Sequence, residues 1–358
     1  MINDDFLLEI LDDASSAHMK NIVSTIQKAQ NAIIRDTQSK VMLIEGIAGS
    51  GKTSALLQRI AFLLYHNRKW LEAENVLLFS PNHLFSDYIS TVLPSLGESG
   101  VPTQTFKSYL EQLVPEFTLL EEDQQEAGFL SGDKDLVKTL KSSLTLIDHI
   151  DAYIETITNY GPLFRDMKIN GRTILSKESI RTWYQETNEL LPLHQRISLL
   201  QTKLLKKLGG LQKDETRQQW VKDLAEEQLQ ELYATDPNLE YTEQKERSLR
   251  KKLANQIVKK RFRRIYRGIM NYQFVNITKQ YLHFIQTIPE IVLAKNHISP
   301  QMWQEHAMRL KENLRQRYLQ QEDAVLFFLL MRKVYPVSAT QKARYILSLI
   351  HISEPTRH

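Results

Sequence analysis

The stretch VMLIEGIAGSGKTS, Val41–Ser54, decides the fold of this chain. Its apolar start, Val41–Ile44, predicts a buried strand, and a helical pattern begins at Lys52 after three glycines. This order fits G-x-x-x-x-G-K-[ST], a loop whose backbone N–H groups close around a phosphate chain at a helix N-terminus. The alternative is a chance glycine turn, but the full pattern is rare at ordinary residue frequencies. The stretch therefore predicts nucleotide binding.

The pattern also assigns roles to individual side chains. Lys52 would hold the outer phosphates, and the hydroxyl of Thr53 would hold a magnesium ion, so these two are the candidate catalytic residues. Mg²⁺ is thus an expected cofactor, with Thr53 as its expected protein ligand. The residues predicted to surround the nucleotide within the loop are Gly46, Ala48, Gly49, Ser50, Gly51, Lys52, Thr53 and Ser54.

Composition places the chain among ordinary globular proteins. It has 358 residues, 42% of them apolar and 25% charged, with a net charge of +4 and no cysteine. The length allows two or three domains, and the missing cysteines exclude disulfides, thiolate metal sites and cysteine nucleophiles. Its longest apolar run is far shorter than the roughly 20 residues that span a bilayer. We expect a cytoplasmic protein without a membrane segment, whose attraction to nucleic acid would come from local charge clusters.

The segments around the loop predict more of a parallel sheet. Residues 1–36 have apolar spacing typical of one or two helices, and the helix after the loop should reach about His66. Six residues of that helix are expected to pack against the sheet. The run Val76–Phe79 then predicts the next parallel strand, which would complete a βαβ unit. The six core residues are Ala55, Leu56, Ile60, Ala61, Leu63 and Leu64.

From about Ser108 to about Tyr335 long polar helical patterns replace the strand-like runs. Pro115–Asp135 is acidic and contains glycine, which predicts a loop, whereas the stripe from Ile147 to Ile157 and the leucine-rich Leu190–Leu211 predict helices. Ser299-Pro300 predicts a helix start.

A basic segment, Arg250–Arg267, carries nine cations and no acid. On a helix, Leu249, Leu253, Ile257 and Ile265 would face one side and most cations the other. The segment could be a solvated face, could pair with the acids of 226–246 in a hairpin, or could contact phosphate backbone or an acidic protein surface, with Phe262 and Tyr266 for stacking. The patch we single out is Lys259, Lys260, Arg261, Arg263 and Arg264.

The residues around the loop resemble superfamily 1 helicases of the UvrD and Rep type. Gln30 stands 16 residues before Gly46 in IQKAQNAII, and a Thr-Phe pair follows later at Thr105 and Phe106. In that family the glutamine reads the adenine edge, so the resemblance implies that Gln30 contacts the nucleotide and that the nucleotide is ATP. Without the loop, Gln30 would read as an exposed helix residue.

Longer stretches resemble the HelD-like ATPases, which recycle RNA polymerase in Gram-positive bacteria. They are IQKAQNAIIRD, GIAGSGKTSALLQRIAFLLY, LPLHQRI and the segment from Leu77 to Phe106. The resemblance implies that Ser80, Pro81 and Asn82 form the second helicase motif and Thr105 with Phe106 the third. These motifs contact single strands or relay the ATP state in typical helicases.

The fold implied is α/β: a P-loop, RecA-like parallel sheet core that is incomplete and carries a large all-helical insertion. The expected organisation is a helical lead-in (1–36), the first half of the motor domain (37–107), the helical insertion (108–335) and a return to a core strand (336–347). By the resemblance the insertion would contact RNA polymerase or its DNA.

One motor element is missing from the sequence. A working ATPase of this kind needs an apolar strand ending in Asp-Glu, for the magnesium shell and the attacking water. The acidic run in TLLEEDQQ, Thr118–Gln125, follows Phe106 too soon, and the better placed strand, ARYIL, runs into SLIHISEPTRH. That ending, 348–358, resembles a translated sequencing-adapter artefact, so we expect native sequence to stop near Leu347. The chain would then be a fragment, short at its start as well. Without the Asp-Glu pair we expect it to hydrolyse ATP negligibly.

The sequence is compatible with three functions. The leading one is the ATP-binding portion of a HelD-type motor that in intact form hydrolyses ATP to remodel RNA polymerase or act on DNA. The second is a non-hydrolysing binding module whose basic helical arm docks on RNA polymerase or nucleic acid. The third, a small-molecule kinase, is disfavoured by the spacing of Gln30 and by the long helical block.

Overall fold

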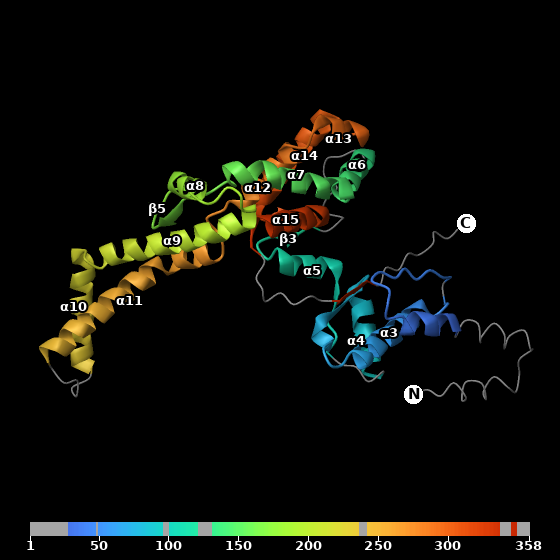
Figure 1. The fold of residues 1–358 in the computed structure, drawn as a ribbon, viewed down its shortest axis with the longest axis horizontal. Coiled ribbons are helices and arrows are strands. Elements are labelled where there is room, and N and C mark those ends of the chain that lie inside the picture. Colours follow the sequence, from blue (N-terminus) through green and yellow to red (C-terminus); the bar gives the residue numbers. More distant parts are fainter. Residues whose placement is uncertain are drawn as a thin grey trace, which may run out of the picture. The chain divides into compact units, whose positions relative to one another are not determined.

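In a computed structural model the described residues are 28–47, 49–95, 100–120, 131–235, 242–336 and 345–348. They are mostly helical, with a few short strands (Figure 1). The chain forms two compact units. Unit 1 takes in the described residues up to Gln112 together with 345–348, and unit 2 spans Leu113–Ser338.

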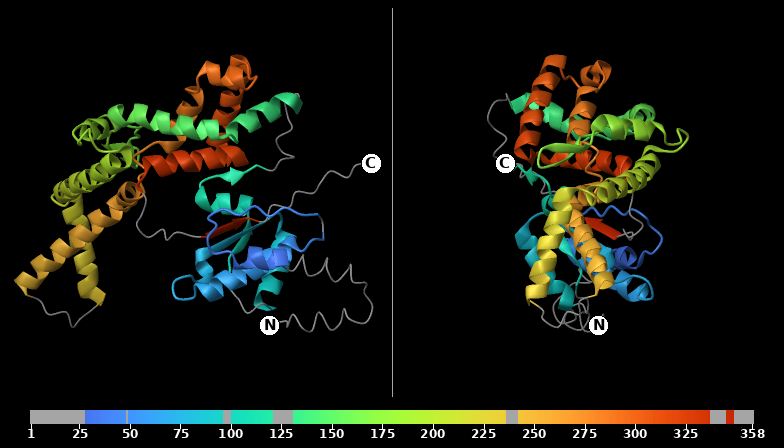
Figure 2. Two further views of the ribbon diagram at one scale, coloured as in Figure 1. Left: turned by 45° about the vertical axis from the view of Figure 1, so that its right-hand side comes forward. Right: turned by 90° about the vertical axis from the view of Figure 1, so that its left-hand side faces the viewer.

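The sheet of unit 1 has three parallel strands in the order β2-β1-β7 (Figure 2). The central strand β1, Val76–Ser80, is buried along its whole length, as the apolar run predicts. Its neighbours are β2, Thr103–Thr105, and β7, Tyr345–Ser348. The latter overlaps the strand expected at ARYIL.

Helices contact β1 from both faces of this sheet. Residues 28–35 are helical, and α3 (Lys52–His66), the 3-10 turn η1 (Ala73–Asn75), α4 (His83–Ser95) and α5 (Phe106–Leu113) follow. Val76 and Leu78 join a cluster with α3 and α4, whereas Phe79 contacts the ring of Tyr109 on α5 at 5.1 Å. The predicted helix after the loop is confirmed; four of its six core residues are buried, and Ala61 and Leu63 are half-buried. The cluster on α3 and α4 comprises Leu56, Leu57, Ile60, Leu64, Ile89 and Leu93.

The strand predicted at Val41–Ile44 does not form. These residues have no strand assignment, and Val41 and Leu43 expose 90% and 83% of their surface. A strand needs a neighbour for its N–H and C=O groups, and the three-stranded sheet β2-β1-β7 does not include this segment. The expected βαβ unit therefore has its helix and second strand but not its first strand.

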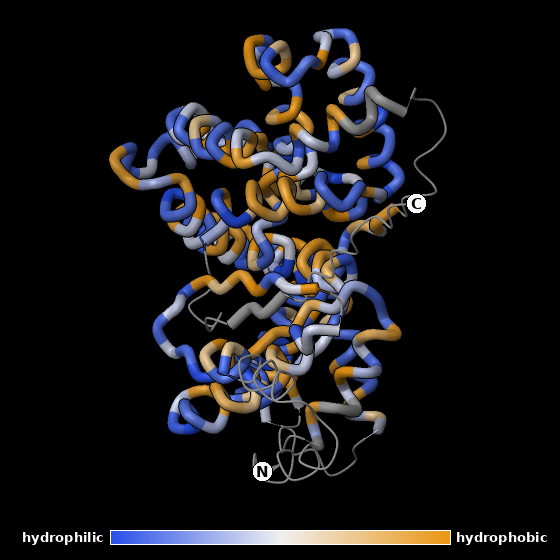
Figure 3. Tube along the Cα trace, turned by 90° about the vertical axis from the view of Figure 1, so that its right-hand side faces the viewer, coloured by the Kyte–Doolittle hydropathy of each residue, from blue (hydrophilic) through white to orange (hydrophobic). Residues whose placement is uncertain are grey.

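Unit 2 is built on ten helices with described positions. They are α6 (Ser131–Lys141), α7 (Leu144–Tyr160), α8 (Lys177–Gln185), α9 (Leu193–Glu215), α10 (Gln219–Thr235), α11 (Glu243–Met270), α12 (Ile277–Gln286), α13 (Glu290–Lys295), α14 (Pro300–Gln316) and α15 (Gln321–Val334). Polar and apolar residues interchange along the tube of these helices, as amphipathic helices require (Figure 3).

Two predicted features of these helices are confirmed. Ser299 accepts the N–H of Met302 at 3.2 Å, and Pro300 occupies the first turn of α14. Leu200, Leu204 and Leu208 form a fully buried stripe on α9. Within unit 2, α11 packs against both α9 and α10, so the three helices form an arm (Figure 1).

The expectation of an all-helical insertion is wrong, because unit 2 contains two short strand pairs. β3 (Thr118–Leu119) pairs in parallel with β6 (Tyr318–Leu319), and β4 (Met167–Ile169) pairs with β5 (Arg172–Leu175) as a hairpin. Strands of two to four residues are too short to give a detectable alternation. The described ends of the predicted loop 115–135 contain β3 and the start of α6, whereas its residues 121–130 lie outside the described residues.

A buried ion pair crosses the interior of unit 2. The ammonium of Lys141 on α6 lies 2.7 Å from Asp323 and 3.3 Å from Glu322, and it also donates to Gln320 at 3.1 Å. The side chains of Lys141 and Asp323 are 0% and 2% exposed. Tyr281 on α12 donates its hydroxyl to Asp323 at 2.7 Å. One cation thus connects three elements.

His306 on α14 is buried in the same unit. Burial, and then the charges of Lys141 and Arg309, hold the pKa of this imidazole well below its usual range. Its Nε2 has no hydrogen-bond partner within the described residues. His306 is therefore neutral at physiological pH.

We expect Lys141→Met to lower the free energy of unfolding by about 3–5 kcal/mol, because it leaves two carboxylates without their buried cation. The matched control is Lys333→Met, which breaks a pair with Asp151 of the same 2.7 Å length whose side chains are half exposed. Urea unfolding should show that the control loses only about 0–1 kcal/mol in free energy of unfolding. Equal losses in the two variants would contradict a structural role for the buried pair.

Candidate functional site

The glycine loop is shaped by two residues in the left-handed region. Gly49 has φ 79° and Gly51 has φ 78°, values that side chains other than glycine rarely adopt. Between them Ser50 donates its N–H to the carbonyl of Ile47 at 3.2 Å, which closes a tight turn. Ala48 lies outside the described residues. The two glycines turn the chain directly into α3.

The N-terminus of α3 is open. Its N-cap is Gly51, which provides no side-chain cap, and its first turn holds no acidic residue. The first amides of a helix have no intrahelical acceptor and carry partial positive charge, so this end favours an anion. Thr53 stands in the first turn and is half-buried, whereas Ser54 is exposed.

Lys52 folds back over the loop that precedes it. Its ammonium donates to the carbonyls of Gly46 and Ile47, the second at 2.8 Å. A negatively charged ligand would compete with these neutral carbonyls for the same ammonium, because charge-assisted hydrogen bonds are the stronger ones.

Gln30 lies beside the loop, although 20 positions separate it from the loop residue it contacts. Its amide Nε2 donates to the carbonyl of Ser50 at 3.1 Å. The helix that carries it is tied to α3 because Arg59 donates to the carbonyl of Ile33 at 2.5 Å. The structure therefore brings the predicted adenine-contacting residue and the predicted phosphate loop together.

The second and third predicted motifs meet at the carboxyl ends of two neighbouring strands. Ser80 and Thr105 are register partners in β1 and β2, and both are buried. Asn82 accepts the N–H of Phe85 at 2.9 Å and so caps α4, while Pro81 is exposed.

The third motif begins α5 in the same way. Thr105 accepts the N–H of Ser108 at 3.1 Å, and Phe106 is 40% exposed with its ring edge-on to Phe79. Ligands of open parallel sheets bind outside the carboxyl ends of the strands, which is where these five residues lie.

The basic segment lies on α11, and pairing with the preceding acids, one of the three alternatives for it, is present. Arg250 donates to Glu226 of α10 at 2.6 Å. Arg261 lies 3.5 Å from Glu215 and 4.9 Å from the ring of Trp220. These two cations are therefore engaged within the arm.

The remaining members of the patch face solvent. Lys259, Lys260, Arg263 and Arg264 are exposed, and no ion pair involves them within the described residues. The expectation that Phe262 is available for stacking is wrong: it is 2% exposed, because it falls on the same side of α11 as the buried Val258, Ile265 and Ile269. Tyr266, 48% exposed, remains accessible.

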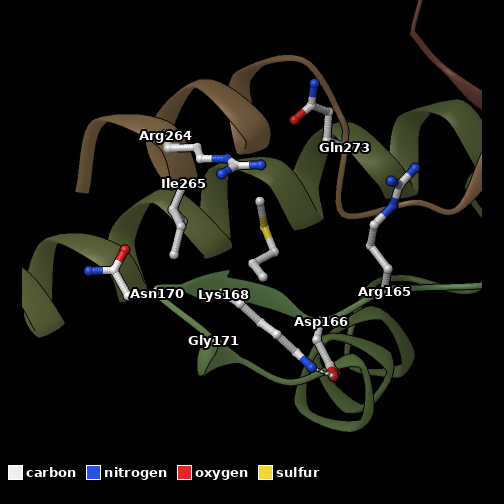
Figure 4. Close-up of a pocket in the computed structure, with 9 residues that line it drawn as sticks. Arg165, Asp166, Lys168, Asn170, Gly171, Arg264, Ile265 and Gln273 are labelled. Carbon is white, nitrogen blue, oxygen red and sulfur yellow. Dashed lines mark ion pairs between the residues drawn. The ribbon is translucent and has the colours of Figure 1, made fainter. Parts of the chain in front are cut away.

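Sequence reasoning missed a pocket in unit 2 that the β4–β5 hairpin forms with α11. It has a volume of about 470 Å³ and includes Arg165, Lys168 and Arg264 (Figure 4). The signal available was Asn170-Gly171, whose φ angles of 47° and 82° place both residues in the left-handed region that two-residue hairpin turns need.

No protein-family model and no curated protein matches the chain. Among the described residues there is also no group of three or more histidine or acidic side chains able to hold a metal ion, and no helix long and apolar enough to cross a membrane.

We expect Gly51→Ala to disrupt the loop more than Gly49→Ala. Both positions have positive φ, which costs about 1–2 kcal/mol for alanine. A Cβ at Gly51 would also lie 2.6 Å from Nε2 of Gln30, whereas one at Gly49 would meet nothing within 4 Å. Thermal unfolding of four proteins, namely the original chain, Gly51→Ala, Gln30→Ala and the double variant, measures this coupling. Purely additive effects of the two substitutions would contradict the close approach.

Proposed function

We propose that unit 1 binds the phosphate chain of ATP with Mg²⁺, and that the chain is the ATP-binding portion of a helicase-like motor of the HelD type in superfamily 1. Such a motor hydrolyses ATP to remodel RNA polymerase or to act on DNA, in the cytoplasm. The observation that carries the proposal is the loop itself: two left-handed glycines lead into an uncapped helix whose first residue is a lysine folded over the loop.

The groups present fit this ligand. The amides of the first turn of α3 and the ammonium of Lys52 would neutralise the outer phosphates. The hydroxyl of Thr53 would hold Mg²⁺, which commonly takes one or two protein ligands and completes its shell with phosphate oxygens and water. Gln30, adjacent to the loop, offers one amide donor and one amide acceptor to the edge of an adenine.

Hydrolysis needs more than these groups, because an attacking water must be positioned and activated. In the described part of unit 1, β1 ends in Ser80-Pro81 and β2 in Thr105-Phe106, without a carboxylate at either end. β7 is followed in the sequence by Leu349 and Ile350. We therefore propose that this polypeptide binds ATP but turns it over negligibly.

The test is a titration of the whole chain with a fluorescent ATP analogue in the presence of Mg²⁺. Lys52→Ala should weaken binding about tenfold to a hundredfold, because a hydrogen bond to a charged group is worth about 1.5–3 kcal/mol. The control is Lys69→Ala, an exposed lysine of unit 1 outside the loop, which should change affinity by less than about twofold.

Unchanged affinity in Lys52→Ala, with circular dichroism showing an intact fold, would overturn nucleotide binding at the loop. Rapid phosphate release by the original chain that is lost in Lys52→Ala would contradict negligible ATP turnover. The same result would support ATP binding at the glycine loop.

A second candidate function is favoured by the four exposed cations on α11. In this function the chain is a non-hydrolysing module whose arm docks on nucleic acid or RNA polymerase. Unlike Arg250 and Arg261, these four side chains take no part in ion pairs within the described residues. A row of such cations on a helix is a suitable surface for phosphate backbone.

Changing Lys259, Lys260, Arg263 and Arg264 to glutamine should weaken binding to single-stranded DNA and lower its salt dependence. Each lost phosphate contact removes about 0.7 from the slope of log affinity against log salt. The matched control removes the same charge from exposed positions elsewhere in unit 2: Arg181, Lys279, Lys295 and Lys311. Equal effects of the two sets would show that net charge, and not the arm, governs binding. Lys52→Ala should leave this binding unchanged.

A further inference from the structure

The pocket between the β4–β5 hairpin and α11 collects positive charge. Arg165, Lys168 and Arg264 line it, and Asp166 is its one carboxylate. Figure 4 shows Arg264 on the helix above the hairpin, Arg165 at the opposite side of the view, and the side chain of Lys168 running to its ion-pair partner Asp166. Three cations and one anion leave an excess of positive charge around a space of about 470 Å³.

The carboxylate is already engaged. Asp166 accepts the backbone N–H of Lys177 at 3.0 Å, and its other oxygen lies 3.4 Å from the ammonium of Lys168. The N–H of Lys177, followed by the contact with Lys168, lowers the pKa of Asp166 below its usual range, so it is ionised at neutral pH. Lys168 is the cation that this carboxylate balances.

The two arginines keep most of their donors for a ligand. Arg165 uses one amino group, Nη2, to donate to the carbonyl of Val275 at 3.2 Å. A guanidinium has five N–H donors, which leaves Arg165 several. Arg264 is exposed and has no ion pair within the described part of the chain. A guanidinium group suits phosphate oxygens, which it can contact in a forked geometry.

The rest of the lining is not suited to a bare ion. Met167 and Ile265 line the same space and are 8% and 2% exposed, so they offer a small apolar surface. Gln273 and Asn170 add amide groups. The volume falls within the roughly 300–1,000 Å³ of small-molecule sites. This combination fits a phosphate ester whose body is a ring of moderate size.

We propose that this pocket binds the phosphate of one nucleotide unit, either as a free mononucleotide or as the 5′ end of a nucleic-acid strand. The site belongs wholly to unit 2 and does not depend on the glycine loop. It differs from the exposed row on α11, because only Arg264 is common to both and the other cations of the pocket come from the hairpin region.

The experiment uses the full chain carrying Lys52→Ala, so that binding at the glycine loop is weakened and separable from binding at this pocket. Calorimetric titration with AMP should show saturable binding, and adenosine should bind at least tenfold more weakly. Arg264→Gln should weaken AMP binding at least tenfold. Its matched control is Arg263→Gln, the neighbouring exposed arginine of α11 outside the pocket, which should change affinity by less than twofold. A second pair of variants makes the same comparison on the hairpin side. Lys168→Gln removes a lysine that lines the pocket and should weaken AMP binding, whereas Lys177→Gln removes a nearby exposed lysine outside it and should not.

Two DNA octamers of one sequence, with and without a 5′ phosphate, separate the two sources. A preference for the phosphorylated octamer that Arg264→Gln abolishes and Arg263→Gln preserves would assign the pocket to strand ends. AMP binding with the same sensitivity, but no preference between octamers, would assign it to free mononucleotides. The proposal is overturned if adenosine binds as well as AMP, if Arg263→Gln and Arg264→Gln act equally, or if no probe binds up to several millimolar.

Discussion

The constraint on which unit 2 depends is the burial of one ammonium group. A lysine without solvent must have anionic and polar partners, since an unpaired buried charge costs several kcal/mol. Lys141 obtains them from residues about 180 positions away, at the turn between β6 and α15. Tyr281 of α12 completes the set through Asp323. These contacts connect α6, α12 and α15, because the partners of one ammonium come from α15 and the residue before it and one of those partners also accepts from α12.

Unit 1 is governed by a different constraint, the backbone of its glycine loop. Left-handed conformations at two positions bring the chain from an extended segment to the start of α3 without a capping side chain. Lys52 and Gln30 then fill the loop from two sides by hydrogen bonds to its carbonyls. A neutral carbonyl is a weaker acceptor for a cation than an anion is. For this reason the proposed function gives this site an anionic ligand.

The cations of α11 divide into two groups with different physical roles. Arg250 and Arg261 form ion pairs with acids of α10 and α9 within the arm. Their exposed neighbours lack such partners among the described residues, and one of them, Arg264, contributes instead to a pocket with the β4–β5 hairpin. A single basic run therefore supports structure, a proposed docking surface and a proposed phosphate pocket at once, according to which side of the helix each residue occupies.

The sequence by itself determined the local elements: the helix from Lys52, the strand at Val76, the capped start of α14 at Ser299 and the apolar stripes of the long helices. Each of these is set by residue spacing or a capping side chain within a few positions. Only the tertiary structure decided that Val41–Ile44 stays outside the sheet, that Phe262 is buried, that Gln30 touches the loop and that Arg264 joins a pocket. These outcomes depend on partners distant in sequence, because strand pairing, ion pairing and burial are properties of two surfaces, and a periodic pattern describes only one of them.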